Sequence, residues 1–333
     1  MKFPTAAILG SGSFGTAMAK LLAPKLGSIV LIGRDPAVAE TINREHKNPH
    51  YLENVMLPEN IRASSSLTDA LTHPLIIFAV PTSATRVTAT ALSKAGLPTD
   101  STLLSCAKGI EKQTGDRMSQ ILREVFPDNP VAALSGPNHA EEIAAGLATC
   151  AVIGSEDQAR ALALQELFTF PHFRSYTSDD VAGIEFGGAI KNVYAIAAGM
   201  AHGLGLGDNA VAALVTRALA EMTRLGTALG GRTETFAGLS GVGDLLVTCF
   251  SEHSRNHRVG LSLGQGKTLE QALDNLGQVA EGVPNALSIH ESARRANVRT
   301  PIIDAVHSIL YEGKSAPLAM KELLARDPRP ENS

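Results

Sequence analysis

Lys191 and Asp244 are residues whose types suit proton transfer. Lys191 lies in the mostly apolar stretch 185–192, and a lysine that is desolvated there binds its proton less tightly. Asp244 follows the glycine-rich segment 241–243, and Thr248 shares its helical face four residues later. Lys191 is therefore a candidate general acid or base. The competing interpretation is a lysine that reaches out of its helix to solvent, and the polar motifs in the same half of the chain weigh against it.

A phosphate site is the second chemical feature of this half. Ser254 is a suitable cap for a helix that begins at Arg255, and the first turn of that helix would present Arg255, Asn256 and free N–H groups. Such a helix start attracts an anion through its N–H groups and its dipole. The motif therefore predicts that a phosphorylated ligand binds here.

A glycine pattern near the N-terminus suits a dinucleotide. Gly10, Gly12 and Gly15 form GxGxxG between an expected strand at residues 5–9 and an expected helix at residues 14–26. The first glycine permits the tight turn, the second lets the pyrophosphate approach the backbone, and the third lets the helix pack on the strand. The alternative is a glycine-rich turn that binds no ligand.

The end of the second expected strand, residues 28–32, bears on the choice of cofactor. An NAD-selective site has Asp or Glu at this strand tip, but here Gly33 and Arg34 come first. Arg34 can pair with a 2′-phosphate, which favours NADPH over NADH and leaves NADH possible. Asp35 comes one residue late and is expected to cap a helix that starts at Pro36. The alternative for Arg34 is an ordinary surface side chain.

Strands and helices alternate through the first half and would position these motifs. Short apolar strands separated by helices indicate a mainly parallel sheet that is covered on both faces. Lys108 and the turn 135–140 each follow an expected strand, at the carboxyl edge where ligands bind in such sheets. Expected strands are residues 5–9, 28–32, 75–80, 102–105, 131–133, 150–153 and 173–176, and expected helices include 83–94 and 157–168.

The second half has a different character. Strand signals stop near residue 178, and stretches rich in Ala, Leu and Met predict helices. The chain of 333 residues is long enough for about two domains. We expect an α/β Rossmann domain at 1–178 and an all-α domain at 179–333, with a polar tail at 326–330 that frays. Expected helices are 181–201, 209–229, 269–276, 285–295 and 302–311.

Composition excludes several classes of protein. Lys and Arg number 29 against 33 Asp and Glu, giving a net charge of −4 without a basic face or tail, so no nucleic-acid partner is expected. No run reaches the roughly 18 apolar residues of a membrane span. Glycines interrupt the apolar N-terminus, which argues against a signal peptide. Three scattered cysteines fit a reducing cytoplasm rather than a disulfide framework.

A metal centre is not expected either. His46 and His50, like His253 and His257, have i,i+4 spacing, but neither pair lies in HExxH or has a third ligand nearby in the sequence. No GxSxG motif or Cys–His hydrolase signature is present. Cys106 is interpreted as a packing residue.

Taken together, these motifs resemble the NAD(P)-dependent glycerol-3-phosphate dehydrogenases of the bacterial type. The resemblance runs from Gly10 to about Lys314 and implies a Rossmann domain followed by a helical domain like that of 6-phosphogluconate dehydrogenase. Its most specific segments are KGIE at 108–111, GP at 136–137, GGAIKN at 187–192, GLSGVGD at 238–244 and SRN at 254–256.

The resemblance implies a role for each matching position. Lys191 matches the catalytic proton donor, and Lys108 a lysine that meets both substrate and cofactor. Asp244 would hold Lys191, with Thr248 as a further partner. The family more often carries Ser or Thr at position 138, and Asn keeps the hydrogen-bonding ability. The substrate site would comprise Lys108, Gly136, Asn138, Lys191, Asp244, Ser254, Arg255 and Asn256; the cofactor site would comprise Gly10, Gly12, Ser13, Phe14, Gly15, Arg34, Lys108, Ala140, Arg255, Val279 and Glu281.

The implied reaction is the reversible reduction of dihydroxyacetone phosphate to sn-glycerol 3-phosphate. Lys191 and Lys108 would stabilise the developing alkoxide, and Lys191 would protonate it. The resemblance also implies a cytoplasmic homodimer that supplies glycerophospholipid synthesis.

Two other functions share some of these features. A related 3-hydroxyacid or 6-phosphogluconate dehydrogenase would share the Rossmann half and a catalytic lysine, but Lys108 and the 254–256 motif argue against it. A dinucleotide sensor without activity would not need Lys191 and Asp244 together.

Overall fold

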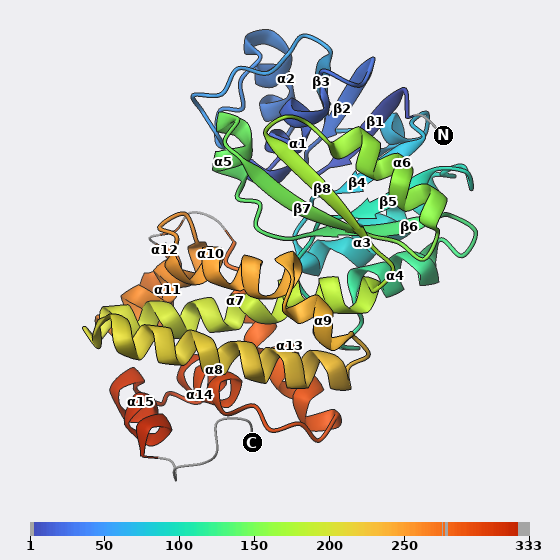
Figure 1. Cartoon of the computed structure of the whole chain (residues 1–333). Coiled ribbons are helices and arrows are strands. Elements are labelled where there is room, and N and C mark those ends of the chain that lie inside the picture. Colours follow the sequence, from blue (N-terminus) through green and yellow to red (C-terminus); the bar gives the residue numbers. More distant parts are fainter. Residues whose placement is uncertain (1–2, 275, 277–278, 326–333) are drawn as a thin grey trace.

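A computed structural model describes residues 3–274, 276 and 279–325, and so leaves the tail at 326–330 outside the described residues. A sheet with flanking helices is followed by a helical part, as expected (Figure 1). None of the helices in the described ranges combines the length and the apolar character that crossing a bilayer needs.

The first part is built on one sheet with the strand order β3-β2-β1-β4-β5-β6-β7-β8. Every neighbouring pair is parallel except β6 and β7, which run antiparallel. The central strands are buried along their length because helices cover both faces, so they read as continuous apolar runs. The strands are β1 Thr5–Leu9, β2 Ser28–Ile32, β3 Ile61–Ser64, β4 Leu75–Phe78, β5 Thr102–Ser105, β6 Val131–Ser135, β7 Thr149–Gly154 and β8 Phe173–Ser178.

Six helices and one short 3₁₀ turn connect these strands. Pro24 explains why the first helix stops at Leu22 rather than at residue 26, because proline cannot continue the hydrogen-bond ladder. The four-residue strand β3 was not predicted, since it is too short to show a pattern. The helices are α1 Ser13–Leu22, α2 Pro36–Glu45, α3 Thr82–Lys94, α4 Met118–Val125, α5 Ala140–Ala145 and α6 Gln158–Phe168, and the turn is Leu67–Ala70.

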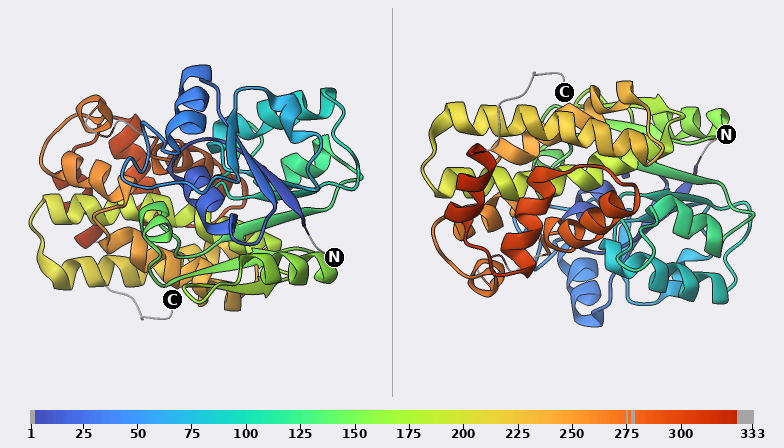
Figure 2. Two further views of the ribbon diagram at one scale, coloured as in Figure 1. Left: turned by 90° about the horizontal axis from the view of Figure 1, so that it is seen from above. Right: turned by 90° about the horizontal axis from the view of Figure 1, so that it is seen from below.

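The second part packs around one long helix, α7. This helix is apolar on nearly every side and is buried along most of its length, as expected of a helix inside a bundle. Both views in Figure 2 place α7 between α8 and the later helices. The helices are α7 Val181–Gly203, α8 Gly207–Ala228, α9 Thr233–Phe236, α10 Asp244–Phe250, α11 Arg255–Gly264, α12 Leu269–Asp274, α13 Gly282–Arg295, α14 Pro301–Tyr311 and α15 Ala316–Leu324; a π-helical turn at Leu239–Gly243 precedes α10.

Glycines let α7 and α11 cross with their backbones in contact. A Cβ at Gly260 would collide with the carbonyl of Ile196, and one at Gly199 would collide with the carbonyl of His257. Side chains larger than hydrogen would push the helices apart. The close crossing therefore fixes where the N-terminus of α11 lies relative to α7.

A buried ion pair joins the two parts. Glu185 on α7 accepts hydrogen bonds from Arg117 Nη1 at 2.7 Å and from the Ser119 backbone N–H at 2.9 Å. Both acceptor atoms belong to a carboxylate that is 4% exposed. Because Arg117 and Ser119 begin α4, this pair anchors the sheet part to the central helix.

Candidate active site

Two lysines share one buried carboxylate where the two parts of the chain meet. Asp244 Oδ1 accepts a hydrogen bond from Lys191 Nζ at 2.6 Å, and Asp244 Oδ2 accepts one from Lys108 Nζ at 2.9 Å. The side chains of Lys191 and Asp244 are 5% and 1% exposed. Lys108 follows β5, whereas Lys191 and Asp244 lie on α7 and α10, so both parts of the chain contribute to the cluster.

Burial sets the protonation of this cluster. Burial lowers the pKa of Lys191 to about 8, and the charge of Lys108 adds to that shift while Asp244 opposes it. Burial would raise the pKa of Asp244, but the two ammonium groups outweigh it and hold that pKa below its usual range. Asp244 therefore stays charged beside a lysine that can give or take a proton near neutral pH.

Thr248 fixes the position of the Lys191 ammonium. Its Oγ1 accepts a hydrogen bond from Lys191 Nζ at 2.7 Å and donates one to the backbone carbonyl of Asp244 at 2.5 Å. The π-helical turn before α10 delivers Asp244 to this point, and such turns are frequent at functional sites.

Lys108 is held by the turn that follows β6. Its Nζ donates to the carbonyl of Gly136 at 2.8 Å and to Asn138 Oδ1 at 2.7 Å. Gly136 has φ of 112°, a conformation that favours glycine. Asn138 Nδ2 is buried without a partner, so this end of the amide is available to a ligand.

The start of α11 has the predicted Ser254 cap, but Asn256, which the motif was expected to present to a phosphate, is buried and hydrogen-bonded within the protein. Ser254 Oγ accepts a hydrogen bond from the His257 N–H at 3.2 Å and caps the helix. Arg255 is exposed and donates to the Val279 carbonyl at 2.8 Å. Both polar ends of the Asn256 side chain are engaged, since Nδ2 donates to Asn192 Oδ1 and Oδ1 accepts from the Gly282 N–H. Asn256 therefore links α7, α11 and α13 at this point.

Of the three glycines in the glycine loop, one has room for a side chain and the other two have none. A Cβ at Gly10 would lie 2.6 Å from the Ala79 carbonyl oxygen, and one at Gly15 would strike the Gly10 carbonyl. A Cβ at Gly12 would meet nothing within 4 Å. This is the cradle that a pyrophosphate needs in front of the N-terminus of α1, where Ser13 and Phe14 form the first turn.

Arg34 and Asp35 follow β2 as expected. Asp35 Oδ1 accepts a hydrogen bond from the Ala37 N–H at 2.9 Å, so Asp35 caps α2 and is not free to bind a ribose. Arg34 is exposed. A Cβ at Gly33 would strike the hydroxyl of Ser11 in the glycine loop, so glycine lets the two loops approach.

Three further cofactor candidates surround the junction of the two parts. Glu281 Oε1 accepts a hydrogen bond from the Thr82 N–H at 2.9 Å and so contacts the start of α3. Val279 is half exposed, and Ala140 is buried at the start of α5. These residues come from both parts of the chain.

Sequence reasoning missed three asparagines that support the site. Asn48 is fully buried, and its Nδ2 donates to the Ser11 carbonyl at 2.8 Å and pins the glycine loop. Asn192 and Asn285 both donate to the Lys108 carbonyl at 3.0 Å. Asn192 stands next to Lys191 in the sequence, but no local pattern points to Asn48 or Asn285, because their partners are far away along the chain.

Cys106 and the histidines do not form a metal centre in the described ranges. No cluster there of three or more His, Cys, Asp and Glu side chains could hold a metal ion. Burial raises the pKa of the Cys106 thiol to about 12, which fits a packing role. His257 Nε2 lies 2.7 Å from His202 Nδ1, so these two rings are hydrogen-bonded to each other.

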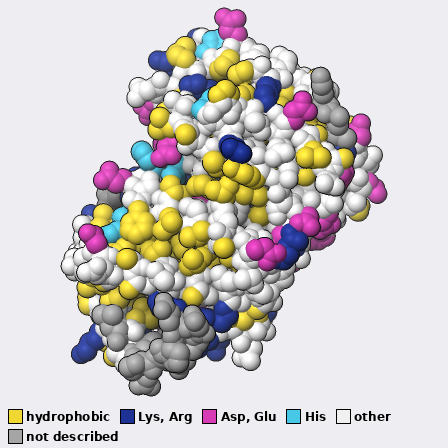
Figure 3. Space-filling model, viewed as in Figure 1, with side chains coloured by type: hydrophobic (Ala, Val, Ile, Leu, Met, Phe, Trp, Pro, Cys, Tyr) yellow, Lys and Arg dark blue, Asp and Glu magenta, His cyan; other side chains and the backbone are white. Residues whose placement is uncertain are grey.

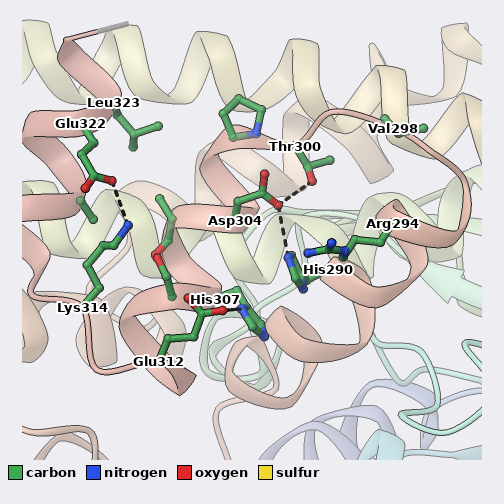
Figure 4. A pocket seen from close by; sticks show the side chains of 14 residues that line it. His290, Arg294, Val298, Thr300, Asp304, His307, Glu312, Lys314, Glu322 and Leu323 are labelled. Carbon is green, nitrogen blue, oxygen red and sulfur yellow. Dashed lines mark hydrogen bonds and ion pairs between the residues drawn. The ribbon is translucent and has the colours of Figure 1, made fainter.

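A cavity of about 510 Å³ lies away from this cluster, among α13, α14 and α15 (Figure 4). Its charged groups are largely paired with one another. Asp304 contacts His290 at 3.5 Å, Glu312 contacts His307 at 3.3 Å, and Glu322 contacts Lys314 at 2.9 Å. Among the described residues that line this cavity, none carries a buried polar side-chain atom without a partner, in contrast to the Lys191 cluster.

Comparisons with known proteins agree with this geometry. The models of the N-terminal and C-terminal parts of NAD-dependent glycerol-3-phosphate dehydrogenase match residues 5–161 and 180–321. A glycerol-3-phosphate dehydrogenase [NAD(P)+] of Moorella thermoacetica is 46% identical over 321 residues, covering 96% of this chain and 95% of its own. The corresponding protein of Clostridium tetani is 44% identical over 324 residues, covering 97% and 93%.

A solved structure extends the similarity to three dimensions. Glycerol-3-phosphate dehydrogenase from Coxiella burnetii superposes with a TM-score of 0.93 at 36% identity. The match covers 98% of this chain and 99% of the other. Both the sheet part and the helical part are therefore arranged alike in the two proteins.

Proposed function

The chain belongs to the NAD-dependent glycerol-3-phosphate dehydrogenase family, and we propose how its residues carry out that reaction. The protein is an oxidoreductase that reduces dihydroxyacetone phosphate to sn-glycerol 3-phosphate with NAD(P)H, reversibly. The single observation that carries the residue assignment is the bond of Lys191 to a buried carboxylate shared with Lys108.

Lys191 acts as the proton donor in the direction of reduction. When bound, the reduced nicotinamide supplies a hydride to the ketone carbon. Lys191 Nζ transfers one proton to the ketone oxygen and becomes a neutral amine, so the product gains one hydride and one proton. Asp244 and Thr248 hold Nζ in place, and the charge of Lys108 stabilises the developing alkoxide.

The start of α11 binds the phosphate of the substrate. Arg255 supplies a charged, planar donor, and the capped N-terminus of this ten-residue helix supplies N–H groups and a favourable dipole. Ser254 and Asn256 keep that turn in place through their own hydrogen bonds. Holding the phosphate fixes the distance from the carbonyl carbon to the cofactor.

The glycine loop, with Ser13 and Phe14, holds the pyrophosphate, and Arg34 pairs with a 2′-phosphate. Asp35 is engaged as a helix cap, which supports a preference for NADPH over NADH. Ala140, Val279, Glu281 and Lys108 complete the cofactor site, with Arg255 shared between cofactor and substrate.

The chain divides into a dinucleotide-binding domain at 1–178 and a catalytic domain at 179–333. This division is supported by the last strand, β8, which ends at Ser178, and by the long helix α7, which begins at Val181. The protein works without a metal and without nucleic acid, in the cytoplasm, and supplies glycerophospholipid synthesis.

The active form is a homodimer. Hydrophobic side chains gather over α10 on the face shown in Figure 3, where Leu246 and Phe250 are 44% and 51% exposed. Exposed apolar groups of this kind favour association. Sedimentation of the purified protein tests the proposal, which predicts twice the 34.9 kDa mass of one chain.

Absorbance of the reduced nicotinamide tests the reaction and the cofactor preference together. Purified protein is mixed with dihydroxyacetone phosphate and either NADPH or NADH. We expect oxidation with both and a higher kcat/KM with NADPH. Equal kcat/KM values for NADPH and NADH would show that Arg34 does not select the cofactor. If the protein bound NADPH but did not oxidise it in the presence of dihydroxyacetone phosphate, the substrate assignment would be wrong.

A further inference from the structure

Four buried polar atoms without partners lie around the Lys108–Asp244–Lys191 cluster. Ser135 Oγ faces Gly188 beside the Lys108 side chain, Asn138 is bonded to Lys108 through its other end, and Ser240 lies in the π-helical turn that leads to Asp244. The fourth atom is Nε2 of His139, next to Asn138. Ser135, Asn138 and Ser240 are each less than 5% exposed.

Such atoms indicate a ligand. Burying a donor or acceptor without a partner destabilises the folded state, so a folded protein rarely keeps several such atoms at one place unless something satisfies them. Ser135 and Asn138 lie beside Lys108, and the charge of Lys191, which we assign to proton transfer, acts on the ring of His139. The substrate itself is the natural partner, because it brings a hydroxyl and a carbonyl to this point.

We propose that His139 recognises the free hydroxyl of the ketone substrate through Nε2, with Asn138 Nδ2 beside it, and so selects hydroxyketone phosphates over ketones that lack this hydroxyl. The proposal rests on the proposed placement of the ketone at Lys191. It gives a specificity-determining role to a residue of the turn 135–140 to which the resemblance assigns no role.

The position of His139 supports this assignment. The residue precedes α5 in the same turn that holds Lys108 through Gly136 and Asn138. Its ring feels the charges of Lys191, Lys108 and Asp244, and its centroid lies 6.2 Å from that of His253, an exposed residue before α11. His139 therefore lies in the turn that holds Lys108, within electrostatic reach of Lys191, and its ring faces one from the second part of the chain.

The charge state of His139 indicates whether it binds the free hydroxyl or the phosphate of the substrate. Burial lowers the pKa of His139 to about 4, with further lowering by Lys191, Lys108 and His253 and partial opposition from Asp244. The imidazole is therefore neutral at neutral pH. A neutral ring next to the Asn138 amide in the same turn suits a hydroxyl, whereas the phosphate has Arg255 and the helix N-terminus.

Two variants and two ketones test the proposal. His139→Phe keeps the size of the ring but has no nitrogen, and His139→Gln retains an amide N–H near the position of Nε2. The two ketones are dihydroxyacetone phosphate and hydroxyacetone phosphate, in which a methyl group replaces the hydroxymethyl group. Wild-type protein is expected to favour dihydroxyacetone phosphate about tenfold in kcat/KM, which corresponds to one hydrogen bond.

In His139→Phe this preference should fall to about one, through loss of activity on dihydroxyacetone phosphate alone, and His139→Gln should retain part of it. The control His253→Phe changes the neighbouring exposed ring and should keep the wild-type preference. Equal losses on both ketones in His139→Phe would overturn the hydroxyl assignment.

NADPH binding separates this test from a folding defect and from the function itself. His139→Phe protein should bind NADPH with a dissociation constant within about twofold of wild type, since the glycine loop is untouched. If wild-type protein reduced neither ketone, the proposed reaction would fall, whereas equal losses would leave the reaction standing and remove only the hydroxyl subsite.

Discussion

At the scale of single residues, the proposed mechanism depends on how weakly Lys191 holds its proton. Reduction needs the ammonium form of Lys191, and oxidation of glycerol 3-phosphate needs the amine. Because burial lowers the pKa of Lys191 to about 8, kcat/KM for reduction should fall as the pH rises through about 8, and kcat/KM for oxidation should rise through the same range.

The measurement is a pair of pH profiles between pH 6 and 10, with initial rates followed in each direction. Opposite limbs with a shared midpoint are the expected result. If both profiles were flat from pH 7 to 9, another group would have to supply the proton.

A second residue, Arg34, tests the cofactor assignment. Arg34→Asp removes the partner of a 2′-phosphate and offers a carboxylate to a ribose hydroxyl, so the ratio of kcat/KM for NADPH over NADH should fall at least tenfold. Arg44→Asp on α2 is the matched control, since Arg44 is also exposed but pairs with Glu40 and Glu45. An unchanged ratio in Arg34→Asp would show that Arg34 does not read the 2′-phosphate.

At the scale of elements, the crossing of α7 and α11 positions the proposed phosphate site. Gly260→Ala places a methyl group against the Ile196 carbonyl, which should cost about 1–3 kcal/mol of unfolding free energy and raise KM for dihydroxyacetone phosphate. Gly27→Ala is the control, because Gly27 is exposed and its Cβ would meet only the Pro4 carbonyl at 3.4 Å. Urea unfolding checks the first effect, and a normal stability of Gly260→Ala would mean that the helices can separate freely.

The anchor between α4 and α7 gives another prediction at this scale. Glu185→Gln leaves the Arg117 guanidinium, which is 13% exposed, facing a neutral amide, and should destabilise the fold by about 3–5 kcal/mol. Glu156→Gln breaks the exposed pair with Arg123 and should cost less than about 1 kcal/mol. Thermal unfolding compares them, and similar melting temperatures for the two variants would contradict the anchoring role.

Local chemistry made several elements predictable. Strands β1, β2 and β5 have the expected bounds because their apolar runs are short and end in turn residues. The caps Asp35 and Ser254 were also predictable, since a cap acts on a backbone N–H two or three residues away. Strand β3 was not, because it depends on pairing with β2 rather than on its own pattern.

At the scale of the whole molecule, the site exists only because distant segments meet. The bond between Lys108 and Asp244 joins residues 136 apart in sequence, and Asn285 reaches the Lys108 carbonyl across 177 residues. The sequence identified Lys108, Lys191 and Asp244 as candidates through their motifs. It held no information on which polar atoms stay unpartnered, so His139 Nε2 and Ser240 Oγ became visible only in the folded chain.

The junction of the two parts is therefore where we propose that binding and chemistry coincide. Lys108 and the turn after β6 come from the sheet, and Lys191, Asp244 and the start of α11 come from the helices. A substrate that contacts both the sheet part and the helical part should bring the cofactor and the proton donor together in a site from which water is excluded.

The most direct measurement of this account is the turnover of Lys191→Ala beside its affinity for NADPH. Loss of the proton donor should lower kcat for dihydroxyacetone phosphate by roughly 10²–10⁴-fold, while the NADPH dissociation constant stays within about twofold of wild type. Retention of more than about a tenth of the wild-type kcat would contradict the assignment of Lys191 as the proton donor.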